Sequence, residues 1–380
     1  MDFDWRPEDR DFKKRVAAVF QDLSIPQVED IEHSELGELK TMTGLFMRKL
    51  AGAGYLEPGR GLAAASDTLR LMAGQEELAR ISGSLFLTVE TSARLFGGLL
   101  SGFGENKTLE ALLHRTLRGE LVGAVAVTEP AREDAPDESG TTAYEDGDAF
   151  VVQGKKNFVT NGPIADYVAV FGQVMDRPAA LFVDPAWPGV SVGPRISTLG
   201  YNGAAVSSLE LRRVRVPRDL VLGPYNDDSV LKFLRRTEDL ILVMASVGIM
   251  TRALSTAKKY SHEHHRNKKP IFAHQEVRFK LAEMLTLLQT SQLLAFRAGW
   301  MCSTGHVETA TLVRCAKVFA AEAAERVATL ALQIMAAAGY VSGNPVERAY
   351  REAKYAALAG TTSELARMAI AEDLLKLHRV

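Results

Sequence analysis

Two short segments of the chain carry a threonine where a predicted strand ends. The first is Val127-Thr128-Glu129-Pro130, and the second is Gly154-Lys155-Lys156-Asn157-Phe158-Val159-Thr160-Asn161-Gly162. A threonine at a strand end offers a backbone N–H and a hydroxyl, a donor and an acceptor together. The polar edge of a flavin ring requires this combination, and Phe158 adds a flat aromatic face beside it. These residue types are therefore suited to the edge and the face of a flavin ring.

The composition is that of an ordinary globular protein with two or three domains. Of the 380 residues, 47% are hydrophobic and 24% are charged, and the formal net charge is -2. The absence of a basic excess argues against nucleic acid as the main partner. The two cysteines, Cys302 and Cys315, lie in helical sequence, which makes a disulfide framework unexpected and predicts a reducing compartment.

The sequence predicts a cytoplasmic protein. Met1-Asp2-Phe3-Asp4-Trp5 begins with acids and lacks a basic segment followed by an apolar run, so we expect no signal or transit peptide. Charged residues interrupt even the densest apolar stretch, from Ile241 to Leu254, so we expect no membrane span.

The period of the apolar residues changes twice along the chain. Residues 1–120 follow a helical repeat, residues 121–225 alternate as strands do, and residues 226–380 are helical again beyond Asp228-Ser229. This order predicts an α+β fold with a helical N-terminal domain, a middle β-domain and a C-terminal helical bundle. Predicted strands are 121–128, 167–171, 179–183 and 208–216, the last with a bulge, and Asp146-Gly147 predicts a hairpin turn.

The two threonine segments resemble those that hold the isoalloxazine ring of FAD in the acyl-CoA dehydrogenase family. The resemblance implies that Thr128 and Thr160 contact the edge of the ring and that Phe158 lies beside it. The resemblance implies that family's fold, whose C-terminal domain is a four-helix bundle. It also implies flavin-dependent α,β-dehydrogenation of an acyl thioester, either an acyl-CoA or an acyl-carrier protein. Later motifs match in the same order: Leu199-Gly200, Val214-Arg215-Val216-Pro217, Leu222-Gly223, Tyr260, Pro270-Ile271, His274-Gln275, Gln333 to Tyr340, Pro345-Val346-Glu347-Arg348 with Arg351, and Gly360-Thr361.

The resemblance assigns further residues to the site. Gln275, Gln333 and Thr361 match positions near the cofactor, and Gly360 matches a substrate-side position. Because the cofactor sites of the family straddle subunits, it implies a homotetramer, with a heterotetramer as the alternative. The electron-transfer partner is not specified by the sequence.

The resemblance also indicates where the catalytic base lies. Most members carry a carboxylate immediately before the closing Gly-Thr, but this chain has Ala359 there. The isovaleryl and some long-chain enzymes carry it instead at the start of the first bundle helix, where a gap-free count back from Gln275 and Tyr260 reaches Glu238. We predict that Glu238 removes the α-proton.

Helical spacing independently supports a functional role for Glu238. It lies in phase with an apolar stripe, four residues from both Leu234 and Leu242, where a charge needs a function or a partner. The alternative is that Thr237 caps a new helix and that Glu238-Asp239 occupy its first turn, favoured by the helix dipole.

Several positions depart from the family pattern. His264, Asn267 and Lys268 replace the residues of a segment that reaches the FAD of a neighbouring subunit, and Ala336 and Ala337 replace a pair of glycines. Ala131-Arg132-Glu133-Asp134 replaces a small-residue turn with acids. We still expect FAD. Two alternatives remain: a catalytically degenerate partner subunit of a heteromeric dehydrogenase, and a flavin-dependent monooxygenase on the same fold.

A histidine cluster raises the question of a metal. His262, His264 and His265 lie close together, but no carboxylate or cysteine follows at ligand spacing. We predict a solvated or cofactor-side face and no metal.

Overall fold

The computed structural model describes residues 5–21, 27–57, 65–130 and 140–377, which form two compact units. Unit 1 takes its described residues from Met1–Ala18, Leu62–Phe86 and Arg235–Val380, and unit 2 from Val19–Gly61 and Leu87–Leu234. Helices precede and follow a central sheet in chain order, which confirms the α+β prediction. The predicted three-domain ranges remain a prediction.

An eight-stranded sheet forms the centre of unit 2. Its order is β6-β7-β3-β2-β4-β5-β8, and β1 pairs with β4 in parallel, outside that path. The strands are β1 (Gly123–Ala126), β2 (Thr142–Asp146), β3 (Ala149–Val159), β4 (Tyr167–Val174), β5 (Arg177–Val183), β6 (Val190–Val192), β7 (Ser207–Pro217) and β8 (Val221–Leu222).

Two local features of the sheet agree with the sequence. Gly147 has a φ of 63° in the turn between β2 and β3, as expected for the predicted hairpin. In the pairing of β3 with β7, Val152 faces Val214 while Gly154 faces Leu211, so β7 carries one extra residue. This is the predicted bulge on the 208–216 strand.

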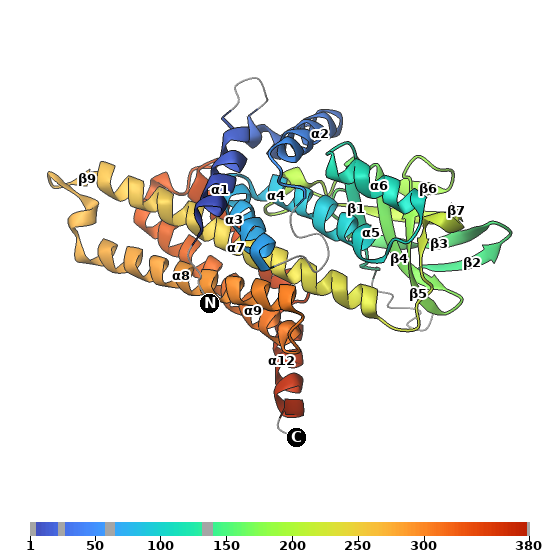
Figure 1. Cartoon of the computed structure of the whole chain (residues 1–380). Helices are drawn as coiled ribbons and strands as arrows, with labels where there is room; N and C mark the ends of the chain where they lie inside the picture. The colour runs from blue at the N-terminus through green and yellow to red at the C-terminus, as the bar shows by residue number, and fades with distance from the viewer. Residues whose placement is uncertain (1–4, 22–26, 58–64, 131–139, 378–380) are drawn as a thin grey trace. The chain divides into compact units, whose positions relative to one another are not determined.

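Helices pack beside the sheet within unit 2. They are α2 (Leu36–Gly52), α5 (Gly97–Phe103) and α6 (Lys107–Leu117), with a π-helical turn at Thr91–Phe96 that precedes α5. Figure 1 shows α5 and α6 next to β1 and β4. Phe96 meets Phe182 of β5 edge to face, with ring centroids 5.3 Å apart, which joins this helical layer to the sheet.

Unit 1 is helical, and its longest helices are α7, α8 and α9 (Figure 1). It holds α3 (Ala65–Ile81), α8 (Gln275–Thr304), α9 (Thr309–Met335), α10 (Pro345–Ala353), α11 (Tyr355–Leu358), α12 (Ser363–Leu377), and a small hairpin of β9 (His265–Arg266) and β10 (Lys269–Pro270). The helices α1 (Pro7–Val19), α4 (Gly83–Glu90) and α7 (Ser229–Glu263) cross the unit boundaries in sequence.

Small residues let the helices of unit 1 approach closely. A Cβ on Gly248 of α7 would lie 2.4 Å from Cβ of Ala79 in α3, so only glycine fits there. In α9, alanines fill the buried stripe, among them Ala316, Ala320 and Ala324. These residues have strong helix propensity and leave room for neighbouring helices.

The helix α7 is long and apolar enough to cross a membrane by length and composition. However, 72% of its apolar window is buried inside the structure. That burial is typical of the core helix of a folded domain.

Candidate active site

Phe158 stands out of the sheet because β3 also carries a bulge near its end. Lys156 lies opposite Leu209 and Val159 opposite Ser207, so β3 has one residue more than β7 over this stretch. Phe158 lies in that stretch with a φ of 54°, a backbone conformation that is unusual for a bulky residue. The residue is 66% exposed and presents an aromatic face at the surface of unit 2.

Thr128 and Thr160 lie on the same part of unit 2 as Phe158. Thr128 follows the end of β1, and its carbonyl accepts the N–H of Asn157, the residue before Phe158, at 2.8 Å. Thr160 follows the end of β3 and is half-buried, whereas Thr128 is exposed. The structure thus brings the predicted ring-edge residues Thr128 and Thr160 close to Phe158, and the contact of all three with flavin remains a prediction.

A buried lysine ties the two threonine segments to each other. The Lys156 side chain is only 3% exposed, and its Nζ lies 2.6 Å from Glu129 Oε1 and 3.1 Å from the Val127 carbonyl. The same Glu129 oxygen accepts the Thr141 N–H at 2.8 Å. No role was predicted for this pair from the sequence. The local pattern gives no sign that Lys156 is buried, because Lys155 and Phe158 near it in β3 are exposed.

The ionisation of this pair follows from its surroundings. Burial lowers the pKa of Lys156, although the Glu129 carboxylate opposes that change. Burial also acts to raise the pKa of Glu129, but hydrogen bonds from Lys156 and from the Thr141 backbone outweigh it and hold that pKa below its usual value. The Lys156–Glu129 contact of 2.6 Å holds the ends of β1 and β3 in register.

Asn161 fixes the turn that carries Thr160. It is fully buried with a φ of 66°, and its side-chain amide donates to the carbonyls of Thr88 at 2.9 Å and Gly123 at 3.0 Å. Asparagine tolerates this left-handed conformation better than most residues. The Thr-Asn-Gly motif therefore has a structural reason that is independent of any ligand.

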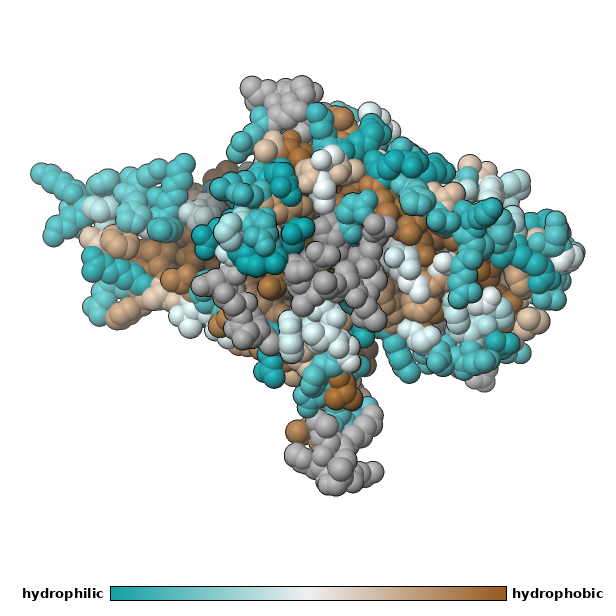
Figure 2. All heavy atoms as spheres, viewed as in Figure 1, coloured by the Kyte–Doolittle hydropathy of each residue, from teal (hydrophilic) through white to brown (hydrophobic). Residues whose placement is uncertain are grey.

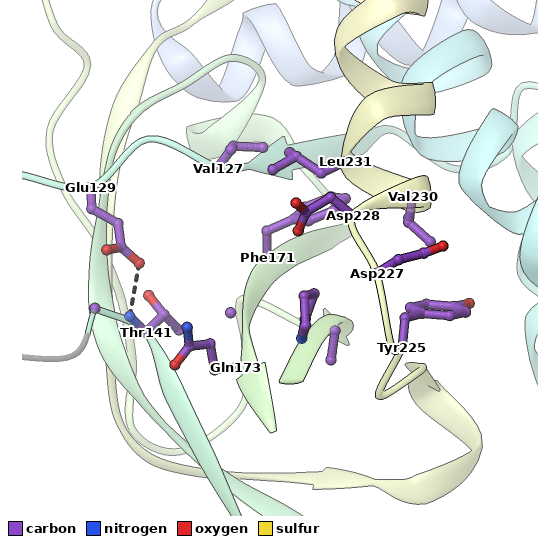
Figure 3. A pocket seen from close by; sticks show the side chains of 14 residues that line it. Val127, Glu129, Thr141, Phe171, Gln173, Tyr225, Asp227, Asp228, Val230 and Leu231 are labelled. Carbon is purple, nitrogen blue, oxygen red and sulfur yellow. Dashed lines mark hydrogen bonds between the residues drawn. The ribbon is translucent and has the colours of Figure 1, made fainter. Parts of the chain in front are cut away.

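A pocket of 270 Å³ opens in unit 2 beside the Thr128 segment (Figure 3). Glu129 reaches Thr141 on one side of it, and Asp227 and Asp228 lie on the other, in the segment that leads into α7. Three carboxylates and the Gln173 amide suit a neutral hydrogen-bonding group or a cation better than a phosphate. The remaining lining residues are Val127, Gly140, Phe171, Gly172, Pro178, Ala179, Tyr225, Val230 and Leu231.

Glu238 lies well inside α7, which is continuous from Ser229 to Glu263. The expected position of Glu238 at the start of the first bundle helix and the alternative that Thr237 caps a new helix are therefore both wrong. The apolar residues before Thr237 extend the same helix. The Glu238 side chain is 27% exposed, and Arg235 Nη1 lies 3.1 Å from its Oε2. Burial raises the pKa of Glu238, the Arg235 charge opposes this, and the Asp239 charge adds to it.

A buried ion pair lies next to Glu238 in unit 1. Lys317 Nζ of α9 is 3.0 Å from Asp239 Oδ1 of α7, with side-chain exposures of 0% and 4%. Lys317 was not among the residues predicted from the sequence. The signal was a lysine in phase with the buried Val313 and Ala320 of α9.

The loop at residues 359–361 packs directly on this pair. Lys317 Nζ donates to the Ala359 carbonyl at 2.5 Å and also to the Thr361 carbonyl. Asp239 Oδ1 accepts the Thr361 N–H at 3.0 Å. A Cβ on Gly360 would lie 2.7 Å from the same Asp239 oxygen. The predicted residues Glu238, Gly360 and Thr361 are thus brought together.

The predicted residues Gln275 and Gln333 lie elsewhere in unit 1. Both are exposed, at the start of α8 and near the end of α9. The Arg326–Glu283 ion pair, at 2.6 Å, joins α8 and α9 near that end. Gln333 is 16 residues beyond Lys317, about 24 Å along the helix at ~1.5 Å per residue. These two residues therefore do not join Glu238.

The β9–β10 hairpin precedes Gln275 in the chain. Asn267 and Lys268 have φ values of 52° and 63°, as a tight turn requires. The ring of His264 stacks on Tyr260, with centroids 4.8 Å apart. Figure 2 shows hydrophilic residues over the hairpin, at the left of the view. Among the residues that the structure describes, no group of three or more histidine, cysteine or acidic side chains could hold a metal ion.

Ala336 keeps a backbone conformation that glycine adopts easily. Its φ is 50° and its ψ is -131°, in a region that is costly for a residue with a Cβ. Ala336 is also the first residue of the short 3-10 helix Ala336–Ala338, which contains Ala337. The acidic substitution at Ala131-Arg132-Glu133-Asp134 lies outside the described residues.

Comparison with known proteins decides the family. Residues 124–214 match the family model for the acyl-CoA dehydrogenase middle domain, and residues 237–375 match the one for the C-terminal domain. Cyclohexane-1-carbonyl-CoA dehydrogenase of Geobacter metallireducens is 31% identical over 351 residues, covering 90% of this chain and 88% of that protein. The chain belongs to the acyl-CoA dehydrogenase family.

Other acyl-CoA dehydrogenase relatives and structures agree over nearly the full length. The 3-(aryl)acrylate reductase of Clostridium sporogenes is 29% identical over 378 residues, covering 97% of this chain and 99% of that protein. A structure of glutaryl-coenzyme A dehydrogenase with glutaryl-CoA has a TM-score of 0.87 at 24% identity, covering 99% of this chain and 97% of that one. The predicted family, fold and reaction class, flavin-dependent dehydrogenation of an acyl thioester, are confirmed.

Proposed function

We propose that Glu238 is the base that removes the α-proton of the acyl thioester in this acyl-CoA dehydrogenase. The observation that carries the proposal is the position of its carboxylate. It lies beside the Ala359–Thr361 loop, where the residue before Gly360 is an alanine that cannot accept a proton. Its raised pKa makes it a stronger base once it is ionised.

Glu238 is suited to hold and exchange a proton. Its carboxylate has one close cationic partner, Arg235, and retains partial exposure. Burial raises the pKa of this carboxyl group, which brings its proton affinity closer to that of a weak carbon acid. As the thioester loses its α-proton to Glu238, the β-hydrogen leaves with its electron pair, and a Cα=Cβ double bond forms.

The acyl-CoA dehydrogenase family is FAD-dependent, and we propose that this chain binds FAD. The residues present fit its ring. An exposed aromatic face at Phe158 lies beside Thr128 and Thr160, whose donors and acceptors suit the ring edge. When bound, FAD would supply the acceptor for the β-hydride. Gln275, Gln333 and Thr361 are proposed cofactor residues, and Gly360 is a proposed substrate contact.

The substrate is proposed to be an acyl-CoA or an acyl-carrier-protein thioester. We further propose a homotetramer in the cytoplasm. Light scattering after size exclusion and fractionation of cells would test these two proposals.

A single observation tests the reaction. The purified protein should be yellow, and its flavin should bleach without oxygen when an acyl-CoA or acyl-carrier thioester is added. Oxygen consumption only after external reduction, with no bleaching by any thioester, would instead support a monooxygenase.

The strained backbone at Ala336 favours one second candidate, a partner subunit of a heteromeric dehydrogenase. In that case the methyl groups of Ala336 and Ala337 reduce flavin binding by this chain alone. A colourless protein that gains flavin only beside a second polypeptide would support this candidate.

A further inference from the structure

Lys317 is a buried cation whose donors are all used within unit 1. Its side chain is fully buried, and its ammonium meets Asp239 Oδ1 at 3.0 Å, the Ala359 carbonyl at 2.5 Å and the Thr361 carbonyl. An ammonium has three N–H donors, so these three oxygens match its capacity. Lysine is almost never fully buried without such partners.

Asp239 completes the arrangement from the other side. Its Oδ1 accepts the Thr361 N–H at 3.0 Å as well as facing Lys317. The two residues before and after Gly360 are therefore held through their backbones, the first by Lys317 and the second by both members of the pair. Gly360 itself has a φ of 62°, and a Cβ there would lie 3.4 Å from Glu238 Cγ.

The same two charges act on Glu238 with opposite signs. Asp239 follows Glu238 in α7 and disfavours its ionisation, while Lys317 of α9 favours it. Arg235 is the third charged group that faces Glu238, and the 359–361 loop presents only backbone groups and small or hydroxyl side chains. The Asp239–Lys317 pair therefore anchors the 359–361 loop and also places a negative and a positive charge beside the Glu238 carboxylate.

We propose that Asp239 and Lys317 are positioning residues that hold the Ala359–Thr361 loop against Glu238 and place opposite charges beside its carboxylate. The proposal rests on the proposed role of Glu238 as the base. Neither residue needs to touch the substrate.

The first test measures the titration of Glu238 without any cofactor. Glutamate carrying ¹³C in its carboxyl group is incorporated, and the Glu238 signal is assigned by its absence in Glu238→Gln. Lys317→Met removes a positive charge and should raise the pKa of Glu238. Asp239→Asn removes a negative charge and should lower it. Shifts in the same direction, or no shift in either variant, would overturn the proposal, because a purely structural defect has no reason to give opposite signs.

Two further variants guard against loss of folding in Lys317→Met. Lys317→Met leaves a buried carboxylate without its cation, which is a costly change. The double variant Lys317→Met/Asp239→Asn removes both charges and should titrate between the two single variants. Lys317→Arg keeps the charge and should stay close to the native titration. If Lys317→Met does not fold, Asp239→Asn and the double variant still carry the test: an unmoved Glu238 titration in both would overturn the proposal.

A second measurement tests the loop. Hydrogen exchange of a peptide that contains Thr361 should be about tenfold faster or more in the double variant. The bonds from the Lys317 ammonium to the loop carbonyls are lost there, and the Thr361 N–H meets a neutral amide instead of a carboxylate. Unchanged exchange there would contradict the anchoring role. The matched control is Lys354→Met, which removes an exposed lysine that pairs with Glu325 of α9 at 2.9 Å and should alter neither readout.

Activity then separates this proposal from the proposed function. If Glu238 is the base, the pH dependence of turnover should shift in the same directions as the Glu238 titration. If Glu238→Gln keeps full turnover while the titration still shifts with opposite signs, the base assignment fails and the positioning pair stands. If Glu238→Gln is inactive but the titration does not move, the base stands and the positioning pair fails.

Discussion

Gly360 lies directly against Glu238, and a Cβ at position 360 would stand 3.4 Å from Cγ of Glu238. The φ of Gly360 is 62°, and the same Cβ would lie 2.7 Å from Asp239 Oδ1. Space and backbone conformation both require glycine there. The loop before α12 therefore packs closely against α7 at the proposed base, and this packing depends on glycine at position 360.

Gly360→Ala should reduce stability and turnover together. The left-handed backbone costs about 1–2 kcal/mol for a residue with a Cβ, and the contact with Asp239 adds to that cost. Gly305→Ala is a matched control, because Gly305 has a φ of 65° with nothing within 4 Å of its added Cβ. Urea unfolding should show a larger loss for Gly360→Ala, and turnover should fall only there. Equal losses of stability in both variants would contradict the contact at Asp239.

Glu238→Gln should raise stability at neutral pH while it lowers activity. Because the pKa of Glu238 is raised in the folded protein, folding favours its protonated form. The unfolding free energy of the native protein should therefore fall as pH rises from about 4.3, the usual glutamate value, through the raised folded pKa. Glu238→Gln has no group that titrates at this position, so its unfolding free energy should not show this fall. The unfolding free energies of the native protein and of Glu238→Gln should therefore converge at low pH and diverge as the pH rises. The measurement is urea unfolding of both proteins from pH 4 to 8. Parallel plots of unfolding free energy against pH would contradict a raised pKa of Glu238.

Ala336→Gly should stabilise the protein and increase its flavin content. Backbone strain of this kind costs on the order of 1–3 kcal/mol, and glycine relieves it at a φ of 50° and a ψ of -131°. Ala337→Gly is the control, since position 337 lies within the 3-10 helix and gains no such relief. Thermal unfolding and the flavin-to-protein absorbance ratio measure both effects. A lower melting temperature for Ala336→Gly would contradict the strain.

Phe158→Gly should weaken flavin binding without destabilising the fold. The aromatic ring is 66% exposed and contributes little packing, while its φ of 54° carries a cost that glycine removes. Phe279→Ala, at a residue of α8 that is 63% exposed, controls for the loss of an exposed ring. Flavin titration should distinguish the two variants. Equal flavin affinity in the native protein and Phe158→Gly would remove Phe158 from the ring site.

The sequence predicted most of the fold and one part of the site for physical reasons. Alternation and turn residues located the strands, and the extra residue in the 208–216 strand was visible because its inward side chains change phase. The Thr128, Phe158 and Thr160 segments were recognisable because their motif is local.

Long-range pairing was not predictable in the same way. The partners of Lys317 and of Lys156 are separated from them by many residues in the sequence. The period of a helix or strand indicates on which face a residue lies, but it does not indicate which distant residue pairs with it. The Thr237 alternative failed because a cap signal inside an apolar run does not break a helix whose face is already buried by α3 and α9 of unit 1. A buried lysine in an alanine stripe was the one overlooked signal.

The most direct test of the base is the rate of flavin reduction in a single turnover. The native protein, Glu238→Gln and Glu238→Asp are mixed with a thioester that bleaches the native flavin, without oxygen, in a stopped-flow spectrometer. The account predicts that Glu238→Gln reduces its flavin about a hundredfold more slowly or worse, with Glu238→Asp between the two. Reduction of the Gln variant at the native rate, with flavin bound, would contradict the assignment of Glu238 as the base.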